Sequence, residues 1–152
     1  MKPINCTKDG QPRTDVSKNY FVGEPTLEDL TGVLGINESK IYHVSFPKGA
    51  KTKLHFHQGG QLLIVTKGSG SLIIFNKIDG DESKFSIQEE QVIELKENSI
   101  QYIPAKVLHT HGSNGQESLS HIAINYNPTQ KTNDAETVWY ESDFKYQVEK
   151  RL

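Results

Sequence analysis

The sequence predicts an all-β protein, a sandwich or a barrel, and three observations carry this prediction. Short stretches rich in branched and aromatic residues recur along the chain, and turn-forming residues separate them. Hydrophobic residues make up only 34% of the 152 residues, which suits short strands joined by many polar turns. The strand patterns do not alternate with long helical patterns, as they would in a parallel α/β fold.

The first 39 residues are expected to form an N-terminal arm and an edge segment. Residues 1 to 20 are polar and contain prolines and glycines, which predicts an extended arm. The segment Pro25–Leu30 is expected to form one helical turn, with Thr26 as its cap.

Residues 40–126 are expected to form the barrel. Strand candidates lie at Lys40–Phe46, Lys53–His57, Gln61–Thr66, Ser71–Lys77, Lys84–Ile87, Gln91–Leu95, Ile100–Ile103, His109–His111 and Ser118–Tyr126. Gly68 and Gly70 are expected to interrupt the chain between the third and fourth candidates. Asp79–Asp81 has the composition of a hairpin turn.

Residues 127–152 are expected to pack on the outside of the barrel. The chain is polar after Pro128, and it then closes with the stretches Val138–Tyr140 and Phe144–Val148. These two stretches predict a short helix or an edge segment, with Trp139 as a packing residue.

Composition excludes several classes of protein. The 17 basic and 19 acidic residues nearly cancel, so charge gives no reason to expect a nucleic-acid or membrane partner. The single cysteine, Cys6, excludes an intrachain disulfide and a cysteine-based zinc site. The apolar runs are too short to span a bilayer, and the N-terminus lacks the apolar stretch of a secretory signal. We therefore expect a cytoplasmic protein with a small-molecule ligand.

The histidines suggest a metal site. The six stand at positions 43, 55, 57, 109, 111 and 121. On a strand, His55 and His57 point to the same face, and Gln61 keeps the same parity. His109 and His111 form a second H-x-H pair, which a barrel can bring to the same interior. Three imidazoles and one oxygen donor suit Mn, Fe, Co, Ni or Zn. Spacing alone leaves the alternative of hydrogen-bonded core histidines open.

The first histidine pair lies in a segment that resembles the first motif of the cupin superfamily. This motif is Gly, five residues, H-x-H, three or four residues, Glu, six residues and Gly. Here the segment reads Gly49-A-K-T-K-L-His55-F-His57-Q-G-G-Gln61-L-L-I-V-T-K-Gly68. Every spacing fits, and Gln61 stands in place of the usual Glu. The resemblance implies a cupin barrel, which is a double-stranded β-helix or jelly roll, with short terminal extensions.

The second cupin motif is matched in part. Pro104 and His109 fit it, whereas Asn98 and Lys106 replace its two glycines and Ser113 replaces its final Asn. Asn adopts the left-handed backbone conformation almost as readily as Gly, so position 98 is a mild change. Lys106 is the larger departure from the motif.

A closer resemblance is to the small cupins related to carboxymuconolactone-decarboxylase-associated cupins, which include manganese-dependent hydroxynitrile lyases. It covers about residues 20–148 and is carried by four segments, His55–Gly70, His109–Gly112, Leu119–Ile124 and Val138–Glu141. Thr110 stands where this subgroup has Trp in its H-W-H-G sequence. The resemblance implies that one divalent metal, manganese first, binds to His55, His57, Gln61 and His109. It also implies that His111, His121 and Thr52 are pocket residues and that the protein forms a homodimer or a higher homo-oligomer.

Two classes of function follow from these expectations. The first is a metal-dependent enzyme, a lyase, isomerase or oxygenase, that acts on a small polar organic molecule, with His111 and His121 as catalytic proton carriers. The second is a non-catalytic cupin that binds or senses a small ligand. A purely structural role remains the alternative for the two histidines and for Thr52. His43 lies outside both motifs and is expected at the surface or in an interface.

Overall fold

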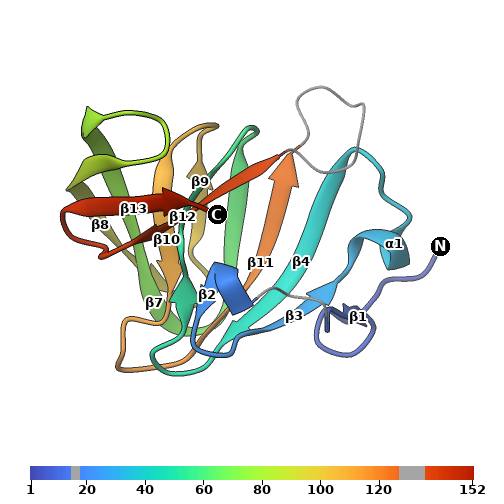
Figure 1. The fold of residues 1–152 in the computed structure, drawn as a ribbon. Helices are drawn as coiled ribbons and strands as arrows, with labels where there is room; N and C mark the ends of the chain where they lie inside the picture. The colour runs from blue at the N-terminus through green and yellow to red at the C-terminus, as the bar shows by residue number, and fades with distance from the viewer. Residues whose placement is uncertain (15–17, 127–135) are drawn as a thin grey trace.

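The computed structural model describes residues 1–14, 18–126 and 136–152, and these residues are almost entirely β (Figure 1). The strands are β1 (Gln11–Pro12), β2 (Phe21–Val22), β3 (Thr26–Asp29), β4 (Ser39–Phe46), β5 (Lys51–Thr52), β6 (Leu54–His57), β7 (Gln61–Gly80), β8 (Phe85–Lys96), β9 (Ile100–Ile103), β10 (Leu108–Gly112), β11 (Leu119–Tyr126), β12 (Thr137–Ser142) and β13 (Gln147–Arg151). The described helices are a 3-10 turn, η1 (Lys18–Tyr20), and α1 (Thr31–Leu34). None of the described helices is long and apolar enough to cross a membrane. The all-β prediction is confirmed.

Strand β7 belongs to both layers of the structure (Figure 1). Its first half pairs with β9 and β11, and its second half pairs with β8 and β10. The predicted interruption at Gly68 and Gly70 is wrong, because the strand runs through both glycines. Gly68 has φ +74° in this stretch, and a Cβ on Gly70 would collide with the carbonyl oxygen of Gly112. The glycines therefore let the strand bend and approach its neighbours closely.

The predicted helical turn at Pro25–Leu30 is also wrong. Thr26–Asp29 forms β3, which pairs along its whole length with β4. The helical turn comes next, at Thr31–Leu34, where the carboxylate of Asp29 accepts a hydrogen bond from the backbone N–H of Thr31 at 2.9 Å. Pairing between strands thus overrides the local capping signal that Thr26 offered.

The closing segment forms two strands rather than a helix. Strand β12 lies between β6 and β13, so it is not an edge of the sheet. Because β10 pairs with both β6 and β7, the strands β7, β8, β13, β12, β6 and β10 close into a ring. The residues 127–135, including the expected polar stretch after Pro128, lie outside the described part of the chain.

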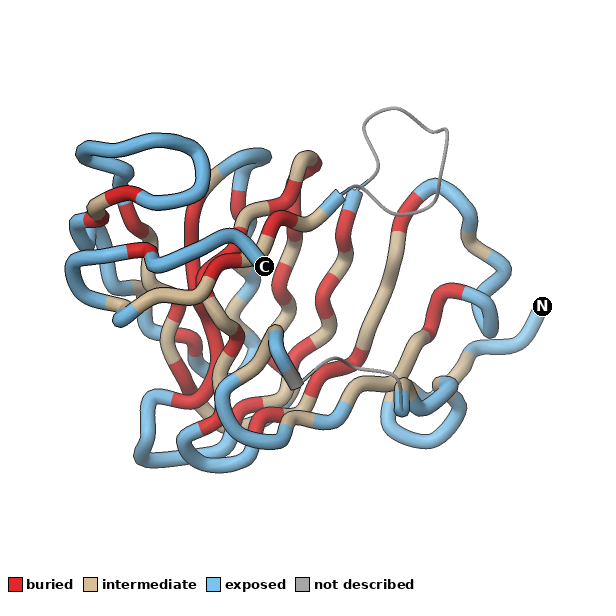
Figure 2. Tube along the Cα trace, viewed as in Figure 1, coloured by how far each residue is buried: buried red, intermediate tan, exposed pale blue. Residues whose placement is uncertain are grey.

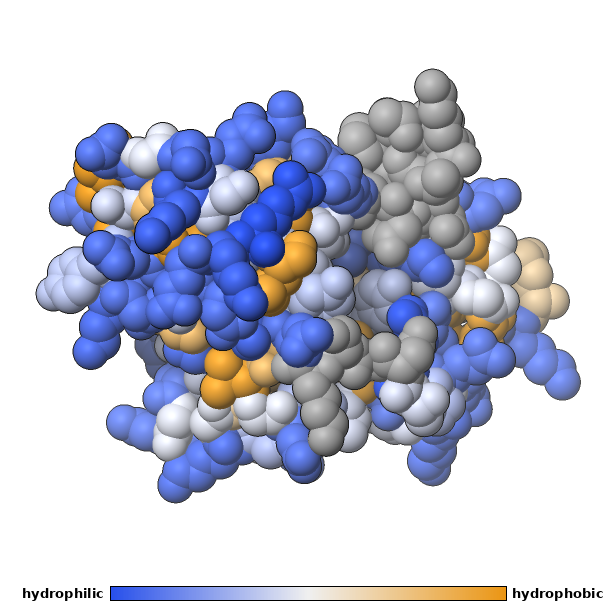
Figure 3. Space-filling model, in the orientation of Figure 1, coloured by the Kyte–Doolittle hydropathy of each residue, from blue (hydrophilic) through white to orange (hydrophobic). Residues whose placement is uncertain are grey.

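Two apolar cores lie on opposite faces of β6, β10 and β12. The first core contains Phe46, Leu63, Leu72 and Leu119 and lies beside the histidines. The second core fills the ring and contains Leu54, Phe75, Phe85, Ile87, Leu108, Val138, Tyr140 and Val148. Buried and partly exposed residues alternate along β11 (Figure 2), as expected when one face of a strand is buried. The surface seen in Figure 3 is mostly hydrophilic, with small apolar patches.

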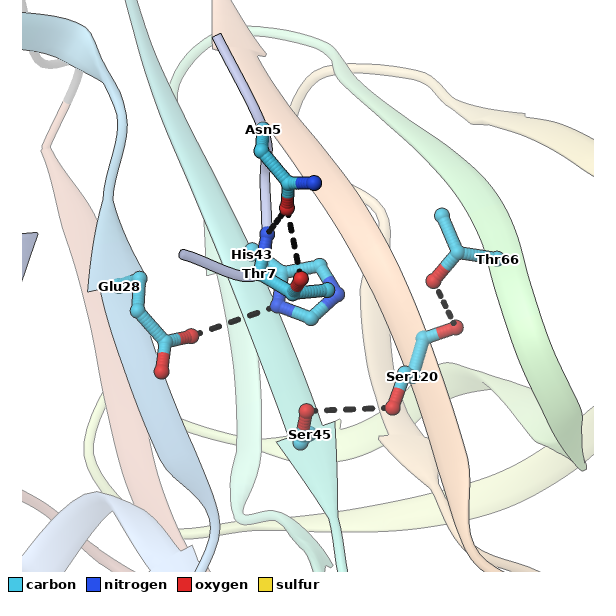
Figure 4. Close-up of polar contacts among 7 residues, drawn as sticks. All are labelled: Asn5, Thr7, Glu28, His43, Ser45, Thr66 and Ser120. Atoms are coloured by element: carbon cyan, nitrogen blue, oxygen red, sulfur yellow. Dashed lines mark hydrogen bonds and ion pairs between the residues drawn. The ribbon is translucent and has the colours of Figure 1, made fainter. Parts of the chain in front are cut away.

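His43 is buried rather than exposed, so the expectation that it lies at the surface is wrong. Only 4% of this residue is accessible. Its Nδ1 lies 3.3 Å from a carboxylate oxygen of Glu28 on the neighbouring strand β3 (Figure 4). Burial is tolerated because the side chain has a polar partner on the neighbouring strand.

The two residues that replace motif glycines adopt the left-handed backbone conformation. The φ angle is +71° at Asn98 and +65° at Lys106. The backbone N–H of Lys106 donates to the carbonyl of His57 at 2.8 Å, so this turn is tied to the strand that carries the first histidine pair. A non-glycine residue at position 106 is therefore compatible with the turn, at a steric cost.

Candidate metal centre

Strand register brings three histidines together. His55 and His57 lie two residues apart on β6 and share a face, and His109 on β10 is the direct cross-strand partner of His55. One ring nitrogen from each lies within 4.8 Å of the other two, and all three residues are buried. The structure therefore brings together the two H-x-H segments as the sequence predicted.

Each of these three rings is oriented through Nδ1. This nitrogen lies 2.8 Å from the carbonyl of Lys53 in His55 and 2.8 Å from the carbonyl of Val107 in His109. A carbonyl only accepts, so Nδ1 donates and Nε2 keeps its lone pair. In His57, Nδ1 lies 2.9 Å from the hydroxyl of Thr137 on β12. A metal-binding histidine is held in this way by the nitrogen that does not touch the ion.

Gln61 is oriented by a neighbour in the same manner. Its amide nitrogen donates to the side-chain oxygen of Asn125 at 2.7 Å, which fixes the other end of the amide. Within the described residues, the Oε1 of Gln61 and the Nε2 of His57 and of His109 are buried without a hydrogen-bond partner. A buried polar atom without a partner costs about 1–3 kcal/mol, and a cation held by the three histidines would give both of these ring nitrogens a partner. The residues present thus fit a divalent metal.

The protonation states suit the same role. Burial, the largest cause, lowers the pKa of His57 from its usual value to about 3 and that of His109 to about 4. Burial and then the neighbouring imidazoles His109, His57 and His111 hold the pKa of His55 well below its usual value. All three rings are consequently neutral at pH 7, and neutral imidazole is the form that binds metals.

His111 and His121 form a second pair beside this cluster. The Nδ1 of His111 and the Nε2 of His121 are 3.1 Å apart, and both rings contact Phe46. Burial first, and then the neighbouring histidines, hold the pKa of His111 well below its usual value. Burial lowers the pKa of His121 to about 4. Both imidazoles are therefore neutral near pH 7, with one hydrogen bond between them.

Thr52 has a supporting position. Its hydroxyl accepts a hydrogen bond from the backbone N–H of His111 at 3.1 Å and lies 3.2 Å from the hydroxyl of Thr110. The hydroxyl of Thr110 in turn lies 2.6 Å from the carbonyl of Thr52, to which it donates. These contacts join β5 to β10, so Thr52 helps to hold in place the strand that carries His111.

A pocket of about 380 Å³ opens over these side chains. It is lined by all the predicted site residues except His109, namely His55, His57, Gln61, His111, His121 and Thr52. A volume of this size accommodates a small organic molecule.

Three residues of the site were not predicted from the sequence. Trp139 was expected only to pack, but its ring stacks on His55 at a centroid distance of 4.3 Å and on Tyr20 at 4.7 Å. Thr137 holds His57, and Asn125 holds Gln61. Alternation along β12 places Thr137 and Trp139 on the same face of the strand. Only the pairing of Trp139 with His55 across the sheet shows that this face points to the site.

Comparisons with known proteins agree with this architecture. A family model described as Cupin matches residues 27–148. No curated protein matches the chain. A cupin-like protein from Thermotoga maritima is 30% identical, with a TM-score of 0.63 and 83% of each chain covered. A polyketide cyclase from Streptomyces resistomycificus is 17% identical, with a TM-score of 0.64, over 94% of this chain and 89% of the other.

Oxalate decarboxylase from Bacillus subtilis is also similar in fold. It is 17% identical, with a TM-score of 0.56 over 82% of this chain, and the match spans only 29% of the longer enzyme. At this identity the likeness to the decarboxylase and to the cyclase concerns the fold alone. Together with the strand arrangement, these matches confirm the predicted jelly-roll fold.

Proposed function

Because the chain belongs to the cupin family, we propose that it is a metal-dependent enzyme acting on a small organic molecule. His55, His57, Gln61 and His109 would hold one divalent transition metal. The observation that carries the proposal is the set of buried acceptor atoms that lack a partner in a cluster of neutral, pre-oriented rings. This arrangement is costly for the protein without an ion and favourable with one.

Manganese is the first ion to test, and Fe, Co, Ni and Zn are the others that this donor set suits. The decarboxylase from Bacillus subtilis that shares the fold has Mn(II) centres. The donors are four neutral groups, so they cancel none of the ion's positive charge. When bound, the ion would supply Lewis acidity to an oxygen of the substrate.

The histidine pair would supply proton transfer. His111 and His121 line the pocket, are neutral at pH 7 and are hydrogen-bonded to each other at 3.1 Å. One of them can accept a proton from a substrate O–H or C–H while the hydrogen bond to the other stabilises the resulting charge. Of the three reaction classes expected from the sequence, this pair favours a lyase or an isomerase, because both need an acid and a base.

The experiment begins with metal content and then removes the proton carriers. Protein purified without added metal is analysed for elements, and His111→Ala and His121→Ala are compared with the parent protein. Cyanohydrins, hydroxy-ketones and small dicarbonyls form the first substrate panel. We expect the kcat for a substrate found in this panel to fall in at least one variant while metal content stays intact.

A non-catalytic role as a ligand-binding cupin gives a different result. The protein would then bind metal and a small ligand, but turnover of the ligand would stay at background in the parent protein and in both histidine variants. Protein that binds no divalent ion would contradict the proposal itself.

A further inference from the structure

A column of aromatic rings that starts in the N-terminal segment covers the His55 imidazole. Trp139 on β12 stacks on His55 with ring centroids 4.3 Å apart and an angle of 26° between the planes. Tyr20 in η1 stacks on Trp139 in turn, at 4.7 Å and 12°. The ring of His109 also contacts His55, at 4.2 Å. Neighbouring rings thus limit how far the His55 imidazole can tilt, and Tyr20 reaches this imidazole through the indole.

The backbone of Tyr20 supports His55 by a second route. The carbonyl of Tyr20 accepts a hydrogen bond from the N–H of Lys53 at 2.9 Å, and the carbonyl of Lys53 accepts one from Nδ1 of His55 at 2.8 Å. Lys53 is the residue between β5 and β6, and its ammonium pairs with the carboxylate of Glu141 on β12. The group that orients the His55 ring is therefore itself held by the N-terminal segment and by β12.

Segment 18–22 is attached to the protein at the site itself. Strand β2 has only two residues and pairs with β5, with Phe21 opposite Thr52. The ring of Phe21 lies 6.0 Å from that of Trp139, so two consecutive residues of the segment contact the same indole. Both residues also line the pocket. Part of the region expected to form an arm and an edge segment therefore belongs to the wall of the site.

From the ring column and the backbone bridge, we propose that Tyr20 is a positioning residue for the metal centre. Its ring holds the indole of Trp139 against His55, and the indole keeps the ring nitrogen of this proposed ligand beside those of His57 and His109. This inference rests on the proposed metal-dependent function and adds segment 18–22 to the residues that support the site.

Substitutions at position 20 test the role of the ring. Tyr20→Phe keeps the stacking ring, Tyr20→Leu replaces it with an aliphatic side chain, and neither removes the carbonyl that holds Lys53. Tyr146→Leu removes a tyrosine ring that is 72% exposed and outside the pocket, and it is the matched control. At pH 7, with free Mn²⁺ measured by electron paramagnetic resonance, we expect Tyr20→Leu to bind the ion about fivefold more weakly. Tyr20→Phe and the control should stay within twofold of the parent protein.

A double-mutant cycle with Trp139 distinguishes positioning from a general loss of structure. If Tyr20 acts through the indole, Tyr20→Leu has no further effect on Mn²⁺ affinity in a Trp139→Leu protein. The visible absorption of the Co²⁺-saturated protein gives a second readout, because it depends on the arrangement of the ligands around the ion. We expect Tyr20→Leu to change this spectrum and Tyr20→Phe to keep it. Tyr20→Met replaces Tyr20→Leu in every comparison if the leucine variant does not fold.

The outcomes separate this inference from the function on which it rests. A parent protein that binds none of Mn²⁺, Fe²⁺, Co²⁺, Ni²⁺ and Zn²⁺ would contradict the proposed metal centre. Parent protein and Tyr20→Leu that bind Mn²⁺ equally well would overturn the positioning role and leave the metal centre in place. The same role would be overturned if Tyr20→Phe weakened binding as much as Tyr20→Leu, or if the full effect persisted in the Trp139→Leu protein.

Discussion

The hydrogen bond between Thr137 and His57 tests how strand β12 contributes to the metal centre. The two residues are cross-strand partners, and the threonine hydroxyl lies 2.9 Å from Nδ1 of the imidazole. Thr137→Val removes the hydroxyl but keeps the branched shape, and the backbone pairing of β12 with β6 is unaffected. The substitution therefore changes the orientation of one proposed ligand and little else.

Two independent arguments give the magnitude. Loss of the partner that orients a metal-binding histidine typically costs 10–100-fold in metal affinity, or about 1.4–2.7 kcal/mol. A buried ring nitrogen left without its partner costs about 1–3 kcal/mol, and His57 is only 6% exposed. The two ranges overlap, so we expect Mn²⁺ to bind about 30-fold more weakly to Thr137→Val.

The assay is a titration with Mn²⁺ in which electron paramagnetic resonance measures the free ion, at pH 7. Thr66→Val is the matched control, because it removes a hydroxyl that donates to the carbonyl of Ser120 at 3.2 Å on the outer face of the sheet (Figure 4). The control should bind Mn²⁺ as the parent protein does. If Thr137→Val melts like the control and keeps its affinity within twofold, β12 does not position the ligands and the reasoning is refuted.

In metal-free protein, the free energy of unfolding should fall as the pH drops from 6.5 to 4. In the unfolded chain His121 gains its proton near pH 6.5, whereas burial lowers its pKa to about 4 in the folded protein. This difference in pKa lowers the free energy of unfolding by about 3 kcal/mol as the pH falls to 4. Urea unfolding at both pH values should show a smaller loss for His121→Gln, and an equal loss would contradict the assignment. Gln61→Glu should tighten Mn²⁺ binding, because a carboxylate attracts the ion more strongly than a neutral amide does; calorimetry in which the Mn²⁺ affinity is unchanged would count against Gln61 as a ligand. The outer face of the sheet carries Ile64 and Ile100 as cross-strand partners, and Ile100 is 66% exposed. We expect this face to pair two copies of the chain, so Ile100→Asp should shift sedimentation from dimer to monomer, and a monomeric parent protein at micromolar concentration would rule this out.

The sequence predicts which residues share a face far better than which strands are neighbours. His55 and His57, like His109 and His111, are two residues apart, and strand geometry alone places each pair on one side. The cupin resemblance then predicts that the two pairs meet, and the pairing of His109 with His55 confirms it. The finer assignment of Gln61 as a ligand stays a prediction, although its oriented amide is consistent with it.

The features that were missed depend on contacts between distant parts of the chain. Trp139 is 84 residues from His55 and reaches it through the register of β12 on β6. No local pattern encodes that register, and the strand's own parity leaves open which face is the site. The same reason explains the error at Thr26, where a local capping signal was outweighed by pairing with β4.

The metal centre depends on the second core as much as on its own ligands. Strand β6 directs His55 and His57 to the pocket, whereas Leu54 and Phe56 point into the second core. Strand β12 does the same: Thr137 and Trp139 face the pocket, and Val138 and Tyr140 face the second core. Because a strand is rigid across its width, packing on one face fixes the side chains on the other. The closing hairpin of β12 and β13 completes the ring of strands. It also places the hydroxyl of Thr137 and the indole of Trp139 against the proposed ligand histidines. Formation of the ring core and positioning of the proposed ligands are therefore coupled through the same strands.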